Sequence, residues 1–195
     1  MEKDKDTTFK KIKFAFHINN LVDTDMHRYE TCIYNYDNQN EITEVIFKNY
    51  IITELHDSIT SLTKLTKLTI TRSYDDEINY FDRYGTDFYD TVLHNLPEAF
   101  GMLQNLKKVD FTGNSLEYLP ESIGNLSNLQ ELILRYNNLK SLSDSFLKLT
   151  KLKYLDLSQN NLDLGVVTKQ LHDIIKRGCV VKGLEKKEQH PYKNK

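Results

Sequence analysis

Residues 106–116 read L-K-K-V-D-F-T-G-N-S-L, and the pattern returns as L-Q-E-L-I-L-R-Y-N-N-L at 129–139 and as L-K-Y-L-D-L-S-Q-N-N-L at 152–162. Three asparagines therefore follow one another at intervals of 23 residues, namely Asn114, Asn137 and Asn160. A fixed period in the twenties with the pattern L-x-x-L-x-L-x-x-N-x-L predicts a solenoid whose coils stack on one another. The alternation of side chains along a strand predicts that Val109 and Phe111 point inward and Asp110 outward. One such strand from each coil, stacked in register, would form a parallel sheet.

These repeats, with L-P-E-S-I-G-N-L at 119–126, resemble the leucine-rich repeat family in its 23-residue form. The resemblance implies an α/β fold: a right-handed β/α superhelix with short parallel strands on its concave face. It also implies an N-terminal hairpin cap, a C-terminal helix-strand cap and a ladder of hydrogen bonds along the three asparagines. In this family the concave sheet face commonly binds other proteins.

The 23-residue register extends backwards, which sets the expected domain organisation. Ile42, Val45 and Phe47 precede Leu65, Leu68 and Ile70 by one period, so the repeats cover residues 42–162. Leu68 and Val109 hold equivalent positions but lie 41 residues apart, which places an 18-residue insertion at about 74–92. An N-terminal cap at 1–41, a C-terminal cap at 163–183 and a disordered tail at 184–195 complete the prediction.

The two caps have their own local patterns. Residues 29–36 and 42–47 read as strands joined by the turn D-N-Q-N at 37–40, which predicts a hairpin with Cys32, Tyr34 and Tyr36 alternating against Ile33. Apolar spacing predicts an amphipathic helix over 163–177, ended by Gly178, and then a short strand at 179–181. Residues 9–22 fit a short amphipathic helix, and strict alternation at 12–18 also fits a strand.

Composition and charge argue against several classes of partner and location. The net charge of −2 gives no electrostatic case for nucleic acid or an anionic membrane as partner, and no apolar run reaches membrane-spanning length. The charged start M-E-K-D-K-D predicts no signal peptide. Cys32 and Cys179 lie near opposite ends of the stack, which predicts free thiols and a cytoplasmic location, with secretion lacking a cleavable signal peptide left open.

No pattern points to catalysis, a cofactor or a metal. The six histidines form no H-E-x-x-H motif, and the seven glycines form neither a dinucleotide fingerprint nor a phosphate loop. The carboxylates of the insertion do not match the spacing of a calcium loop. We therefore expect a protein that is not an enzyme.

Candidate partner-binding residues fall in two places. Large side chains at outward strand positions predict a patch of Ile133, Arg135, Tyr136 and Tyr154, which Lys48, Lys67 and Arg72 extend, because Tyr and Arg are favoured interface anchors. The insertion carries tyrosines among carboxylates, including Tyr74, Tyr80, Tyr84 and Tyr89. These residues either bind a partner or cover the edge of the solenoid, and the outward patch has a plain solvated sheet face as its alternative.

The sequence thus predicts a non-catalytic protein-protein interaction module that uses the concave sheet face and the Tyr/Asp-rich insertion. The alternative is a secreted pathogen effector or adhesin that recognises a host protein or glycan. The oligomeric state and the identity of the partner are left open by the sequence.

Overall fold

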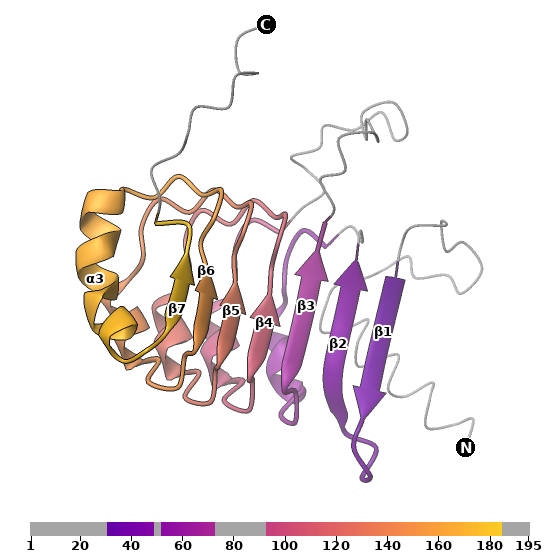
Figure 1. Ribbon diagram of the computed structural model, residues 1–195. Helices are drawn as coiled ribbons and strands as arrows, with labels where there is room; N and C mark the ends of the chain where they lie inside the picture. The colour runs from indigo at the N-terminus through magenta and orange to yellow at the C-terminus, as the bar shows by residue number, and fades with distance from the viewer. Residues whose placement is uncertain (1–30, 49–51, 73–92, 185–195) are drawn as a thin grey trace, which may run out of the picture.

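The computed structural model describes residues 31–48, 52–72 and 93–184, in which one sheet runs the length of the molecule (Figure 1). Its strands are β1 (Thr31–Tyr36), β2 (Ile42–Lys48), β3 (Lys67–Thr71), β4 (Lys108–Asp110), β5 (Glu131–Ile133), β6 (Tyr154–Asp156) and β7 (Val180–Lys182). Between them lie the 3-10 helices η1 (Asp57–Ser61), η3 (Glu98–Met102), η4 (Glu121–Asn125) and η5 (Asp144–Lys148), and the helix α3 (Leu164–Lys176).

The strands follow one another in the sheet in chain order, as the 23-residue period predicts. β1 and β2 form the antiparallel hairpin, and every later pair is parallel. The inward residues pair as consecutive neighbours across the described strands, in the order Val45, Leu68, Val109, Leu132, Leu155 and Val181. The predicted register is therefore confirmed in the described part of the chain.

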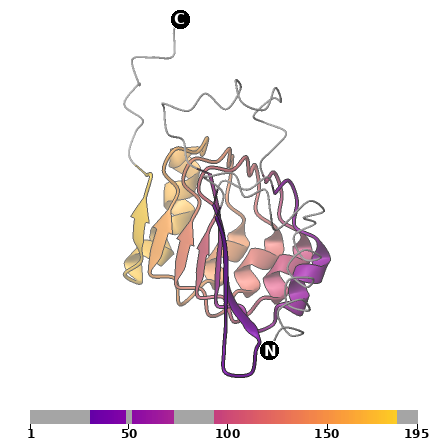
Figure 2. The same ribbon diagram turned by 90° about the vertical axis from the view of Figure 1, so that its right-hand side faces the viewer.

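The 3-10 helices form the wall of each coil opposite the sheet (Figures 1 and 2). Each begins after a residue with an extended backbone, and in two coils that residue is the predicted proline, Pro97 or Pro120. Aliphatic and aromatic side chains fill the space between the walls, and the largest fully buried ones are Phe47, Phe100, Phe111 and Phe146. No coil could bury this apolar surface alone, so stacking of coils supplies the hydrophobic stabilisation.

Asparagine side chains connect each coil to the one before it. The Asn137 side-chain nitrogen donates to the carbonyl oxygen of Phe111 at 2.8 Å and to that of Leu134 at 3.0 Å. Its side-chain oxygen accepts from the Leu116 amide at 3.0 Å. Asn114 and Asn160 repeat this arrangement one coil earlier and later. The ladder implied by the family resemblance is therefore present and satisfies backbone groups that the inward turn buries.

The coils approach each other closely along the 3-10 helices. A Cβ atom added to Gly101 or Gly124 would lie 2.3 Å or 2.4 Å from a carbonyl oxygen of the next coil, that of Ser122 or Ser145. Both glycines hold the same position of the repeat, so only glycine permits this spacing between coils.

The C-terminal end closes with α3 and β7. Asp163 caps α3 by accepting a hydrogen bond from the Gly165 amide at 2.9 Å, and Val167, Leu171 and Ile174 are buried. β7 then adds a parallel strand beside β6. The helix and final strand predicted from the sequence are confirmed, with ends shifted by about one residue.

The alternation predicted for the hairpin extends to Tyr36. The rings of Tyr34 and Tyr36 meet edge to face with centres 5.7 Å apart, and Tyr36 pairs with the buried Ile42, so the two tyrosines share one side of β1. The pairing register with β2 shifts between Asn35 and Tyr36, and the Tyr36 side chain is exposed. The predicted segment 9–22, the insertion at 74–92 and the tail beyond residue 184 lie outside the described residues.

Candidate functional site

The side chains that point away from the 3-10 helices form what we call the outer sheet face. Strand pairing arranges them in rows that cross the strands. The first row is Asn35, Glu44, Lys67, Lys108, Glu131 and Tyr154; the second is Ile33, Ile46, Thr69, Asp110, Ile133 and Asp156. The third, which backbone hydrogen bonds continue past the short strands, is Lys48, Thr71, Thr112, Arg135 and Ser158.

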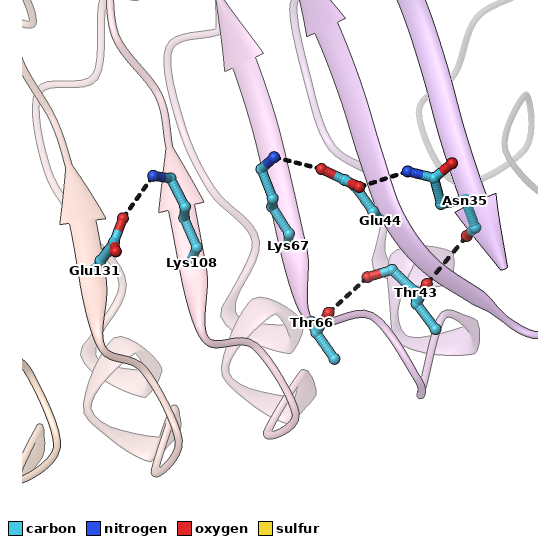
Figure 3. Close-up of polar contacts among 7 residues, drawn as sticks. All are labelled: Asn35, Thr43, Glu44, Thr66, Lys67, Lys108 and Glu131. Carbon is cyan, nitrogen blue, oxygen red and sulfur yellow. Dashed lines mark hydrogen bonds and ion pairs between the residues drawn. The ribbon is translucent and has the colours of Figure 1, made fainter. Parts of the chain in front are cut away.

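The first row neutralises its own charges (Figure 3). Lys67 forms an ion pair with Glu44, which also accepts a hydrogen bond of 2.5 Å from the Asn35 side-chain amide. The hydrogen bond from Lys67, more than its charge, lowers the pKa of Glu44 below its ordinary value. Lys108 and Glu131 form a second ion pair, with 2.5 Å between nitrogen and oxygen. The cations of this row are therefore already occupied within the sheet.

Ile133, Arg135 and Tyr136 lie together on β5 and its continuation, as predicted. The side chain of Ile133 is half-buried and that of Arg135 is exposed. The Arg135 guanidinium carbon lies 4.7 Å from the centre of the Tyr136 ring, and Arg135 Nη2 donates to the Tyr136 hydroxyl at 3.2 Å. This cation–π contact holds the guanidinium in place at the surface.

Tyr154 belongs to the neighbouring strand but lies in the first row, two rows from Arg135. Its ring centre is 5.7 Å from the Lys182 ammonium nitrogen, and its hydroxyl is 3.4 Å from a carboxylate oxygen of Asp156. Because a strand rises about 3.3 Å per residue, the two rows are about 13 Å apart. The predicted patch is thus a stripe along β5 and β6, with Tyr154 at its far end.

The basic residues expected to extend the patch divide into three cases. Lys48 is exposed in the third row, three strands from Arg135. Lys67 is ion-paired with Glu44. The Arg72 side chain is only 5% exposed, so the expectation that it presents its charge at an open surface is wrong. Tyr74, Tyr80, Tyr84 and Tyr89 lie outside the described residues.

Two structural details of the face were missed by sequence reasoning. Asp110 accepts hydrogen bonds from the Thr112 amide at 3.0 Å and from the Thr112 hydroxyl at 2.7 Å, and Asp156 accepts one from the Ser158 amide at 2.9 Å. Both carboxylates thus cap the backbone at the end of their strands. The pattern Asp-x-Thr/Ser at 110–112 and 156–158 was the available signal.

The thiols are shielded. Cys32 and Cys179 are both free, and burial raises the pKa of Cys32 to about 11 and that of Cys179 in the same direction. The described residues contain no group of three His, Cys, Asp or Glu side chains placed to hold a metal ion. Along the same ranges, no helix has the length and apolar character needed to cross a membrane.

Comparison with known families decides what these coils are. Residues 104–162 match the leucine-rich repeat family, and residues 151–174 match a second leucine-rich repeat description. The repeats within residues 104–174 are therefore leucine-rich repeats. A comparison of the chain with curated protein sequences gives no match.

Solved structures show the same fold. A leucine-rich repeat protein of Leptospira interrogans is 26% identical with a TM-score of 0.51; the match covers 67% of this chain but only 28% of that one. The ectodomain of the receptor kinase SOBIR1 from Arabidopsis thaliana is 16% identical with a TM-score of 0.51, covering 79% and 80% of the two chains. A plant ice-binding protein is 21% identical with a TM-score of 0.50, covering 83% of this chain and 49% of that one. These likenesses confirm a leucine-rich repeat solenoid.

Proposed function

We propose that this protein is a non-catalytic interaction module that binds a protein partner through its outer sheet face. Leucine-rich repeat proteins commonly bind proteins and are typically not enzymes, which supports the general part of the proposal. The finer part depends on one observation: the Arg135–Tyr136 pair lies at the surface beside Ile133, on a face without a covering layer in the described residues.

The pair has the properties of an interface anchor. Tyrosine and arginine are the side chains that most often carry binding energy, because they bury a large area and still form hydrogen bonds. Here the ring and the guanidinium already contact each other, so a partner would not have to order them from a mobile state. Ile133 adds apolar area directly next to the pair.

We include the insertion at 74–92 as a second contact because its tyrosines suit a recognition loop. Deletion of residues 74–92 separates the two readings of this segment. If the insertion binds a partner, the shortened chain stays folded and loses capture. If it covers the solenoid edge, the shortened chain unfolds at a lower denaturant concentration.

Affinity capture from a native lysate, followed by mass spectrometry, tests the sheet-face proposal. The double variant Arg135→Ala with Tyr136→Ala should keep the thermal stability of the parent and lose the captured partner. The matched control is Tyr118→Ala with Lys140→Ala, which removes a similar cation–π pair, 5.6 Å from ammonium nitrogen to ring centre, located between β4 and η5 rather than on the sheet. Equal capture by both double variants would rule out the sheet face as the binding surface.

A further inference from the structure

We infer that the partner presents a carboxylate-rich protein segment, and that Arg135 and Lys48 are the cations that receive it. This inference depends on the proposed function, because it assigns the chemistry of the partner that the outer sheet face binds. It follows from which charges on that face are already compensated and which are not.

The first row offers no free charge. Its two lysines and two glutamates are joined as Lys67–Glu44 and Lys108–Glu131, so the row is neutral and its hydrogen-bonding capacity is largely used. A charged partner segment would gain little there, because it would have to replace existing ion pairs. Any electrostatic selectivity of the face must therefore come from the other rows.

Arg135 is the most available cation of those rows. Within the described residues, no carboxylate lies within ion-pair distance of its guanidinium, and its only side-chain hydrogen bond goes to the Tyr136 hydroxyl. A guanidinium has five N–H donors in a planar fork that matches a carboxylate, so most of them remain for a ligand. Contact with the Tyr136 ring restrains the guanidinium, which lowers the entropy cost of binding.

The anions of the second row form no ion pair with Arg135. Asp110 and Asp156 lie in the second row on either side of Ile133. Each spends a carboxylate oxygen on backbone or hydroxyl donors of its own strand end, and the Asp156 side chain is only 7% exposed. Lys182, over the ring of Tyr154, adds a further cation at the β7 end.

Lys48 supplies the second contact and sets a spacing. It lies in the same row as Arg135, three strands away, and neighbouring strands are about 4.8 Å apart, so the two strand positions are separated by about 14 Å. An extended chain advances about 3.4 Å per residue and turns alternate side chains to the same side. Two carboxylates four residues apart in an extended segment that crosses the strands would reach both cations.

The charge on the face suits a peptide rather than a nucleic acid. The two cations of the third row can pair with two carboxylates, whereas nucleic-acid binders rely on a basic stripe that contacts many phosphates. The net charge of the whole chain is −2, which opposes binding of a polyanion outside this face.

Binding of fluorescently labelled octaglutamate, measured by fluorescence anisotropy at low ionic strength, tests the inference on the full chain. Arg135→Gln and Lys48→Gln should each weaken binding about threefold or more, and added salt should weaken it further. Lys169→Gln is the matched control, because it removes the same charge from an exposed position on α3, away from the sheet. Its affinity for octaglutamate should equal that of the parent chain.

Three results would overturn the inference: no binding of octaglutamate, equal binding by Arg135→Gln and Lys169→Gln, or tighter binding of an eight-nucleotide oligo-dT than of octaglutamate. Failure of the inference is distinguishable from failure of the proposed function. If the partner captured from lysate depends on the Arg135–Tyr136 pair but binds Arg135→Gln as well as the parent, the face binds a protein without using carboxylates. If the double variant Arg135→Ala with Tyr136→Ala captures the partner as well as the parent does, the proposed function itself is wrong.

Discussion

The side-chain amide of Asn137 donates to the carbonyl oxygen of Phe111 in the preceding coil, at 2.8 Å, and both residues are almost fully buried. The same side chain also bonds the Leu134 carbonyl and the Leu116 amide. Asn137→Ala should therefore lower the free energy of unfolding by about 2–4 kcal/mol, because it leaves several buried backbone groups without a partner. Urea unfolding followed by circular dichroism measures the loss.

Asn128→Ala is the control for that experiment. Asn128 also donates to a backbone carbonyl of the previous coil, that of Gln104 at 2.9 Å, but it does so at an exposed edge where water can replace the bond. Its loss should cost less than about 1 kcal/mol. Equal losses for Asn128→Ala and Asn137→Ala would show that burial of the ladder is not what makes it stabilising.

The close approach of coils at Gly124 gives a second prediction. Gly124→Ala places a methyl group 2.4 Å from the Ser145 carbonyl oxygen, so the coils must separate, at a cost of about 1–3 kcal/mol. Gly165→Ala, in the first turn of α3, meets only a side-chain oxygen of Asp163 at 3.3 Å and should change stability little. Thermal unfolding of both variants checks this, and a stable Gly124→Ala protein would contradict the packing described here.

The Lys67–Glu44 pair makes a pH-dependent contribution. Because the pKa of Glu44 is lower in the folded protein, the pair stabilises the fold above the ordinary glutamate pKa of about 4.3 and loses this effect as the pH falls through the lowered value. Lys67→Met should raise the pKa of Glu44, as read by carbon-detected NMR titration. Parent and variant should differ in stability at pH 7 and converge in acid; Lys140→Met, outside the sheet, should leave the Glu44 titration unchanged.

Cys32 should react slowly in the folded protein. Burial raises its pKa to about 11, so at pH 8.5 it holds about 100-fold less thiolate than an unfolded cysteine with a pKa near 8.5. Iodoacetamide labelling followed by mass spectrometry measures the rate at which Cys32 is alkylated. This rate should be correspondingly slower without urea than in about 8 M urea, which unfolds the protein. Comparable rates in the two solutions would refute the shielding of this thiol.

Most of the fold could be predicted because residues 23 apart hold equivalent positions in successive coils, so the location of one gives the location of the next. Once Val109, Leu132 and Leu155 are recognised as equivalent, their pairing and the inward side of each strand follow from the alternation of a strand. The same reasoning does not reach residues 9–22 or 74–92, which have no counterpart in another coil.

The candidate site was less predictable because a row position locates a Cβ atom and not the end of a long side chain. Arg72 follows the third-row residue Thr71 as Tyr136 follows Arg135, yet the Arg72 side chain is buried and that of Arg135 is exposed. Tyr36 shows a related limit: it lies on the same side of β1 as Tyr34, as alternation predicts, yet its side chain is exposed. The Asp110 and Asp156 caps could have been found, since an acidic residue two positions before Thr or Ser commonly bonds that amide.

The ladder of Asn114, Asn137 and Asn160 makes the molecule extensible. Each asparagine bonds only its own coil and the preceding coil, so a duplicated 23-residue unit inserted at this junction would bring every donor and acceptor that its neighbours need. Each added unit would widen the sheet by one strand spacing, about 4.8 Å. Selection or engineering can therefore lengthen this surface in fixed steps without redesigning either end.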